Sequence, residues 1–215
     1  MNNQHTMYAT VEVVIFTYHQ NQIKVFLQKN SDKSLKGKWA LPVFPLKTKD
    51  SIEKTIKKAS QHFENLELKT GWNINVFSDP ERFPKKRVIA FPVIMFCSSE
   101  KVDEGSLDIQ WISISLLSGL VLDHKKIINE AISSLRMQTA SQEYVFHLLP
   151  SRFTLTQLQE CLECIYETML DKRNFRKRIL LSEVVKPTKS KEKGVAHKAA
   201  VLYTLNAKAL RNFKA

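Results

Sequence analysis

Apolar residues along the chain follow two different spacings, and the spacing changes near residue 141. Before that point, short runs rich in β-branched and aromatic residues predict strands over residues 10–18, 23–29, 87–98 and 107–115. Apolar positions at helical intervals predict helices over residues 50–66 and 124–141. The first part of the chain is therefore expected to form one domain of mixed strands and helices.

After residue 141 the pattern becomes mainly helical. Over residues 154–170 an apolar stripe steps by three and four positions, and Thr154 with Gln157 forms a capping-box start. A basic segment, 172–181, predicts a second helix, and two short strands follow it, separated by a Lys-rich stretch. The order helix, helix, strand, basic loop, strand is that of a winged helix-turn-helix. The sequence thus predicts an α+β protein with a mixed domain in residues 1–140 and a winged helix domain in residues 141–215.

The charge of the chain favours a polyanionic partner. The net charge is +12 and the isoelectric point about 9.6, and residues 171–198 hold 10 Lys and Arg against 3 Asp and Glu. No apolar run is long enough to predict a transmembrane helix, and the N-terminus does not have the pattern of a signal peptide. The three cysteines do not suggest a disulfide framework, and Cys161 and Cys164 lie on the helical stripe, where core packing is a simpler role than zinc binding. These features predict a cytoplasmic protein.

The basic helix is expected to have one packing face and one reading face. At about 100° per residue, Phe175 and Ile179 point the same way, while Arg173, Asn174 and Lys177 point roughly opposite. Arg, Asn and Lys are the side chains that read guanine and adenine edges in a major groove. A solvated basic helix is the plainer alternative, and membrane binding would require the two apolar residues to be free to insert.

The preceding amphipathic helix and the following basic hairpin favour binding to double-stranded DNA over both alternatives. Flanking cations suit phosphates, and the Lys-rich loop would act as the wing. Two-fold symmetry commonly doubles such a domain, so a homodimer is expected. The residues predicted to contact DNA are Thr154, Gln157, Lys172, Arg173, Asn174, Arg176, Lys177, Arg178, Lys189, Lys191, Lys193, His197 and Lys198.

The segment "LLPSRFTLTQLQECLECIYETMLDKRNFRKRILLSEVV", residues 148–185, with "AAVLYTLN" behind it, resembles the C-terminal domain of the Nudix-related (NrtR-like) transcriptional regulators. The resemblance includes the run "LDKRNFR" at 170–176 and extends over about 60 residues. It implies a Nudix-like sandwich of mixed β-sheet and helices in front of the winged helix, acting as an effector and dimerisation domain.

The Nudix resemblance also provides a frame for asking whether this domain still carries out catalysis. A Nudix hydrolase holds Mg²⁺ or Mn²⁺ with carboxylates on a helix. Aligned to that box, the first Glu falls on Asp50, but the later carboxylate positions fall on Ala59, His62 and Phe63, and the first Gly falls on Phe44. These residues cannot supply the carboxylates that a hard cation prefers. We therefore expect no bound metal, no cofactor and no hydrolysis.

A ligand-binding role is still open for the same domain. The stretch "SDPERFPKKRVIAF", residues 78–91, resembles a segment of the same regulators, whose effector is a nucleotide-type molecule such as ADP-ribose or, in some branches, a sugar metabolite. On that resemblance Asp79, Arg82 and Arg87 are candidate ligand contacts, with the two arginines suited to a pyrophosphate. The plainer alternative is a turn with surface charges. For the whole protein, the rivals to a regulator are a divergent Nudix hydrolase acting on nucleoside diphosphate derivatives and a non-specific nucleic-acid-binding protein.

Overall fold

A mixed β-sheet forms the centre of the N-terminal part in the computed structural model, which describes residues 6–30, 35–84, 86–102, 107–138, 144–192 and 199–209. The sheet has seven strands in the order β3-β2-β1-β6-β5, with β4 pairing with β1 and β7 with β2. The long strands β1 and β6 are parallel, and the other pairs are antiparallel. The strands are β1 Met7–His19, β2 Gln22–Lys29, β3 Trp39–Ala40, β4 Val43–Pro45, β5 Lys69–Asn73, β6 Arg87–Phe96 and β7 Ile109–Ser113.

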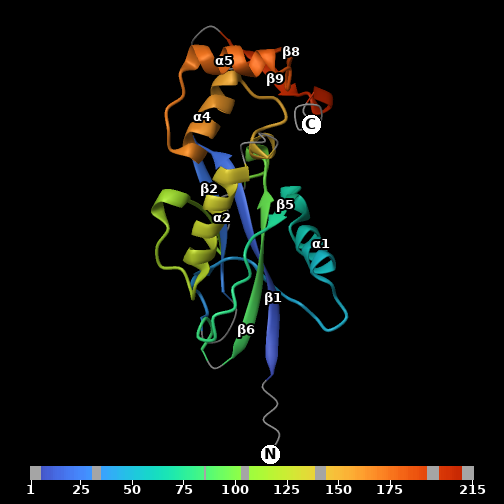
Figure 1. Ribbon diagram of the computed structural model, residues 1–215, viewed down its shortest axis with the longest axis vertical. Helices are drawn as coiled ribbons and strands as arrows, with labels where there is room; N and C mark the ends of the chain where they lie inside the picture. Colours follow the sequence, from blue (N-terminus) through green and yellow to red (C-terminus); the bar gives the residue numbers. More distant parts are fainter. Residues whose placement is uncertain are drawn as a thin grey trace, which may run out of the picture.

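One long helix lies on each side of this sheet (Figure 1). Side chains alternate along a strand, so Val13 of β1 joins the apolar cluster under α1 (Ile52–His62), and Val14 joins the cluster under α2 (His124–Gln138). Short 3-10 turns occur at Glu64–Leu66, Ser99–Lys101 and Ile114–Leu116. The result is the expected sandwich of helices and mixed sheet.

The C-terminal part has the expected order of helices and strands. Its elements are α3 (Val145–Leu148), α4 (Leu155–Tyr166), α5 (Lys172–Leu181), β8 (Val185–Lys191) and β9 (Val201–Leu205), with β8 and β9 antiparallel. They lie together at one end of the molecule in Figure 1, beyond the end of the sheet where β1 turns into β2. No helix within the described ranges is long and apolar enough to cross a bilayer.

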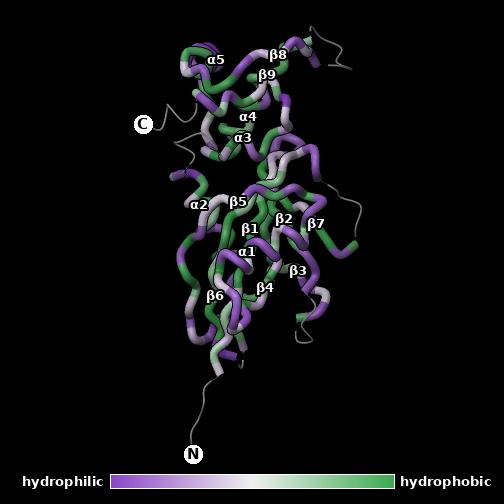
Figure 2. Tube along the Cα trace, turned by 90° about the vertical axis from the view of Figure 1, so that its right-hand side faces the viewer, coloured by the Kyte–Doolittle hydropathy of each residue, from purple (hydrophilic) through white to green (hydrophobic). Residues whose placement is uncertain are grey.

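A continuous apolar core connects the two parts. One cluster of buried residues runs from Phe16 and Leu27 in the sheet, through Ile128 in α2, to Leu158 and Leu162 in α4. The tube in Figure 2 is correspondingly green along the strands that lead toward α4. At the seam, the Cys164 Sγ–H of α4 donates to the Asn21 carbonyl in the β1–β2 turn at 3.3 Å. The winged helix is therefore packed on the sheet rather than connected by a linker alone.

Candidate nucleic-acid interface and effector pocket

The basic helix α5 has the two faces that its sequence predicts. Asp171 caps its start by accepting from the Asn174 N–H at 2.7 Å. Ile179 is 4% exposed and Phe175 is half-buried, and both pack against the apolar core. The outward-facing residues, all exposed, are Lys172, Arg173, Asn174, Arg176, Lys177 and Arg178.

The turn before α5 is fixed to α4 by polar side chains. The Glu163 carboxylate accepts from the Leu170 N–H at 2.8 Å, and Gln159 Nε2 donates to the Leu170 carbonyl at 3.0 Å. Gln159 also donates to Glu163 at 2.9 Å, which closes a small network. Because this network holds the chain just ahead of α5, α4 and α5 form one rigid unit.

The strands β8 and β9 form a wing attached to the start of α4. Phe153 and Tyr203 exchange backbone hydrogen bonds at 3.0 and 2.7 Å, and Thr188 Oγ1 donates to the Leu202 carbonyl at 2.8 Å. Lys189 and Lys191 are exposed on β8. This places two cations on the same domain as α5, where they suit phosphate oxygens.

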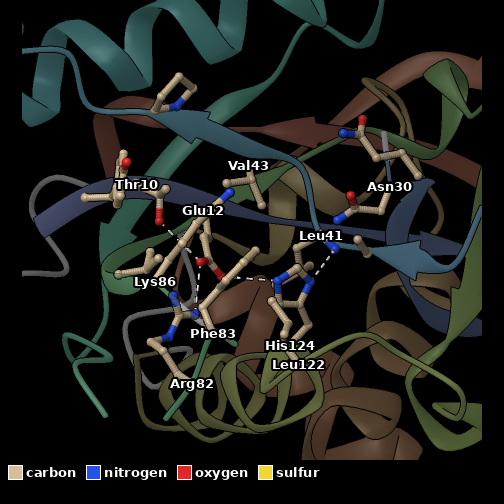
Figure 3. Close-up of a pocket in the computed structure, with 15 residues that line it drawn as sticks. Thr10, Glu12, Asn30, Leu41, Val43, Arg82, Phe83, Lys86, Leu122 and His124 are labelled. Carbon is tan, nitrogen blue, oxygen red and sulfur yellow. Dashed lines mark hydrogen bonds and ion pairs between the residues drawn. The ribbon is translucent and has the colours of Figure 1, made fainter. Parts of the chain in front are cut away.

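The N-terminal domain contains a cavity of about 450 Å³ beside β1. Figure 3 shows Glu12, Arg82 and His124 directed toward one another in it. Tyr8, Phe83 and Val88 give it apolar walls, and Gln28 and Asn30 line it from β2 and the residue after it. The full lining is Tyr8, Thr10, Glu12, Gln28, Asn30, Ala40, Leu41, Val43, Pro45, Arg82, Phe83, Lys86, Val88, Leu122 and His124.

A buried ion network lies at this cavity. Arg82 donates from Nη2 to Glu12 Oε1 at 2.9 Å and to Asp123 Oδ1 at 2.8 Å, and from Nε to Asp123 Oδ2 at 2.9 Å. The side chains of Arg82 and Glu12 are 1% and 3% exposed. Burial raises the pKa of Glu12, and the attraction of Arg82 opposes that rise. The arginine thus connects β1 to the segment that leads into α2.

His124, the first residue of α2, completes the network. Its Nδ1 accepts from the Leu41 N–H at 2.9 Å, so the proton of the neutral ring is on Nε2, which lies 3.6 Å from Glu12 Oε2. Burial lowers the pKa of His124 to about 4, with Asp123 opposing the shift. The imidazole is therefore neutral at neutral pH, and its orientation is set by Leu41.

Two of the positions aligned to the Nudix box in the sequence analysis are Phe63 and Asp50. Phe63 packs edge-on against Phe26 and Phe44, with ring centroids 5.3 and 6.1 Å apart. Asp50 accepts from Lys54 and Lys58 at 2.8 and 2.5 Å, and these hydrogen bonds lower its pKa to about 2. Across the described ranges, no group of three or more His, Cys, Asp and Glu residues is arranged to hold a metal ion.

Comparison with known proteins relates these two sites to a family. Residues 145–205 match the model of the NrtR DNA-binding winged helix domain. A relative from Acinetobacter baylyi, the ADPR responsive transcriptional repressor NtrR, is 29% identical over 192 residues, which cover 83% of this chain and 74% of the relative. The C-terminal part of the chain is therefore similar to the winged helix domain of NrtR-type regulators.

Solved structures share the whole two-domain fold of this chain. Shewanella oneidensis NrtR, in a complex with a 27mer DNA, superposes with a TM-score of 0.79 at 23% identity, covering 94% of this chain and 95% of that one. A MutT/nudix family protein from Enterococcus faecalis gives 0.68 at 17% identity, covering 94% and 89%. The expected fold class, a Nudix-like domain followed by a winged helix, is therefore confirmed.

Two of the residues expected to contact DNA take part in the cap of α4. Thr154 Oγ1 accepts from the Gln157 N–H at 3.0 Å, and Gln157 Oε1 accepts from the Thr154 N–H at 2.8 Å. Thr154 is only 3% exposed. The capping box thus has its predicted geometry, and it removes the Thr154 hydroxyl from the surface. Lys193, His197 and Lys198 lie outside the described residues.

The candidate ligand residues of the N-terminal domain separate into one that lines the cavity and two that do not. Arg82 lines it, but its guanidinium is engaged by two carboxylates, which leaves it poorly placed for the expected pyrophosphate. Arg87, the first residue of β6, donates to the Ser78 carbonyl at 2.6 Å, and Asp79 accepts from the Glu81 N–H at 2.9 Å, and neither residue lines the cavity.

Sequence reasoning did not single out Glu12, Asp123 or His124 as residues of a site. Glu12 had a usable signal, because it interrupts the apolar run "TVEVVIF" with a charge. A carboxylate inside a strand that is otherwise buried requires a partner. Asp123 gave no comparable signal, since its partner is 41 residues away in the sequence.

Proposed function

We propose that this protein is a transcriptional regulator that reads DNA with α5 and binds a small effector in its Nudix-like domain. The observation that carries the proposal is α5 itself, which directs six polar or cationic side chains outward while Phe175 and Ile179 pack inward. Residues 1–140 would form the effector and dimerisation domain, and residues 141–215 the DNA-binding domain.

In the proposed complex, the side chains of α5 divide between bases and phosphates. Arg173, Asn174 and Lys177 would reach base edges, while Lys172, Arg176 and Arg178 would contact phosphates on either side. Lys189 and Lys191 of the wing would add phosphate contacts. Since one winged helix reads only a few base pairs, a homodimer on a two-fold symmetric operator is part of the proposal.

The cavity beside Glu12 is the proposed effector site. Its volume of about 450 Å³ suits a small metabolite, and it combines apolar walls with a few polar groups. The Acinetobacter relative is described as ADPR responsive, so ADP-ribose is the first candidate effector for this chain. Three free cysteines among the described residues support a reducing compartment, and we place the regulator in the cytoplasm.

We further propose that the domain senses without hydrolysing. Hydrolysis of a diphosphate by this fold needs carboxylates around Mg²⁺ or Mn²⁺. Ala59 and Phe63 are buried apolar side chains at two of those positions, and the carboxylate of Asp50 is paired with Lys54 and Lys58. This chemistry disfavours the divergent-hydrolase alternative.

The test of DNA reading is fluorescence anisotropy with the protein's own upstream region and a scrambled duplex, across salt. A specific regulator should prefer the cognate duplex by about 10³-fold, with both affinities falling as salt rises. Equal binding to both would contradict specific recognition of that region and favour a non-specific nucleic-acid-binding protein. Incubation with ADP-ribose and Mg²⁺, followed by chromatography, tests the absence of hydrolysis.

A further inference from the structure

Helix α2 contacts both sites, because its first residue lines the effector cavity and its last turn contacts the winged helix domain. Its 15 residues span about 22 Å at 1.5 Å per residue. We propose that α2 transmits the state of the pocket to the recognition helix, and that Arg136 is the positioning residue through which this coupling passes. The inference rests on the proposed function and adds the route by which its two sites communicate.

At the pocket end, the start of α2 is tied to the lining of the cavity. Leu122 and His124 line the cavity, and Asp123 between them receives two hydrogen bonds from Arg82. Leu122 has a φ of 51°, in the left-handed region, so the backbone here is held in a conformation that only the surrounding contacts sustain. A ligand that displaces Arg82 or Glu12 changes the forces on the first turn of α2 directly.

Between its ends, α2 is packed as a rigid element. Ile127, Ile128 and Ala131 are fully buried, and Leu135 is 2% exposed. The Trp72 Nε1–H donates to Ser134 Oγ at 2.7 Å. A helix held this closely responds to a force at one end by shifting as a body, because packed interiors do not deform continuously.

At the other end, Arg136 connects α2 to the C-terminus of α4. Its Nε donates to the Ile165 carbonyl at 2.8 Å, and its Nη2 lies 2.5 Å from Glu167 Oε1. The last carbonyls of a helix have no partner within the helix and carry partial negative charge, so a guanidinium is well matched to them. Glu167 is the left-handed cap of α4, with φ 52°.

From α4 the coupling reaches α5 through the hydrogen bonds among Gln159, Glu163 and Leu170. Gln159 and Glu163 hold Leu170, one residue before the Asp171 cap of α5. A shift of the C-terminal end of α4 therefore moves the start of α5, where Arg173 and Asn174 lie. In a dimer, such a movement changes the spacing of the two recognition helices. That spacing has to match the spacing of the two operator half-sites.

The test is a double-mutant cycle that needs no effector. Asp123→Asn perturbs the pocket end, Arg136→Gln removes the contact with α4, and the readout is the Kd for the cognate duplex. We expect Asp123→Asn to change the Kd by about three-fold or more in the wild-type background and by less than half that factor beside Arg136→Gln. Lys126→Gln is the matched control, an exposed cation on the same helix, and it should leave the effect of Asp123→Asn intact.

The same fold-change in both backgrounds, or no change from Asp123→Asn in the wild type, would overturn the coupling. Thermal unfolding identifies variants that fail to fold, and Arg136→Lys then replaces Arg136→Gln, since it keeps the charge but not the fork of donors. A second arm adds ADP-ribose to wild type and Arg136→Gln. Retained ligand binding with a reduced effect on DNA supports the inference. Equal cognate and scrambled binding by the wild type contradicts the proposed function separately.

Discussion

Arg82 holds Glu12 and Asp123 with a single guanidinium, at 2.9 and 2.8 Å, so that β1 and the start of α2 share one buried cation. The pair of carboxylates would repel each other without it. Burial alone raises the pKa of Glu12, and the arginine is what favours its ionised form. The stability of the N-terminal domain should therefore depend strongly on this one side chain.

Arg82→Met should lower the free energy of unfolding by about 3–5 kcal/mol, because it leaves buried carboxylates without a partner. Urea unfolding followed by circular dichroism measures the loss. Arg87→Met, five residues along, where the arginine donates to the Ser78 carbonyl, is the matched control and should cost less than about 1 kcal/mol. Equal losses from the two variants would show that the ion network does not stabilise the fold.

His124 gives the stability a defined dependence on pH. Its pKa is about 4 in the folded protein, against 6.5 in the unfolded chain, so the unfolded chain binds more protons between these values. Its contribution is complete above pH 6.5 and is lost as the pH falls toward 4, by about 3 kcal/mol in total. Glu12, whose pKa is raised, makes a contribution to stability that decreases as the pH rises, and this contribution is present in both the wild type and the variant. As the pH falls from 6.5 to 4, the free energy of unfolding should decrease less steeply for His124→Asn than for the wild type.

His62 and Phe63, the neighbours that the sequence alignment places at the Glu-Glu pair of a Nudix box, should respond very differently to substitution by Glu. Phe63→Glu places a carboxylate among Phe26 and Phe44 and should cost about 3–5 kcal/mol. His62→Glu changes an exposed residue and should stay within about 0.5 kcal/mol. Chemical denaturation of both variants measures the two losses. A large loss for Phe63→Glu alone would show that position 63 is part of the apolar core, whereas small losses for both variants would show that both positions accept carboxylates.

Base-reading and phosphate-binding residues should separate in DNA titrations. Arg173→Ala or Asn174→Ala should cost roughly 1–3 kcal/mol on the cognate operator and relax preference at particular bases. Lys191→Ala should weaken cognate and scrambled duplexes alike and reduce the salt slope by about one. If all three variants behaved identically, the assignment of α5 as the reading element would fail.

Thr154→Ala tests the capping role of a residue first expected at the DNA. Loss of the cap should lower the free energy of unfolding by about 1 kcal/mol while the salt slope of DNA binding is unchanged. Thr156→Ala, in the first turn of α4, is the comparison because the Thr156 hydroxyl accepts from Arg176 at 3.3 Å and does not cap the helix. A changed salt slope for Thr154→Ala would indicate that Thr154 contacts a phosphate of the DNA.

The long periodic elements could be predicted from sequence because burial sets their pattern locally. The stripe of α4 and the inward pair on α5 follow from helical geometry alone, and both occur as expected. Pro92, like any proline in a strand, requires a bulge or an edge position. It lies in β6 between β1 and β5, and the pairing with β5 shifts register over Thr70–Asn73, close to the proline.

Other features could not be read locally. Strands β3 and β4 are two and three residues long, which is too short for any alternation to appear. In β5, Gly71 breaks the pattern, and a Cβ there would lie 2.7 Å from the Phe96 ring, so the strand needs its glycine for close approach. The ion network depends on partners far apart in sequence, and only the fold brings them together.

The apolar core that passes from the sheet through α2 into α4 has a consequence for how such regulators diversify. Separating the winged helix from the N-terminal domain would expose to water the apolar contacts that α4 makes with β2 and α2. The N-terminal domain and the winged helix domain therefore cannot be exchanged independently of each other. A new effector specificity has to arise by substitution of side chains around the cavity. The alternative is to exchange the N-terminal domain together with the residues of α4 that pack against it.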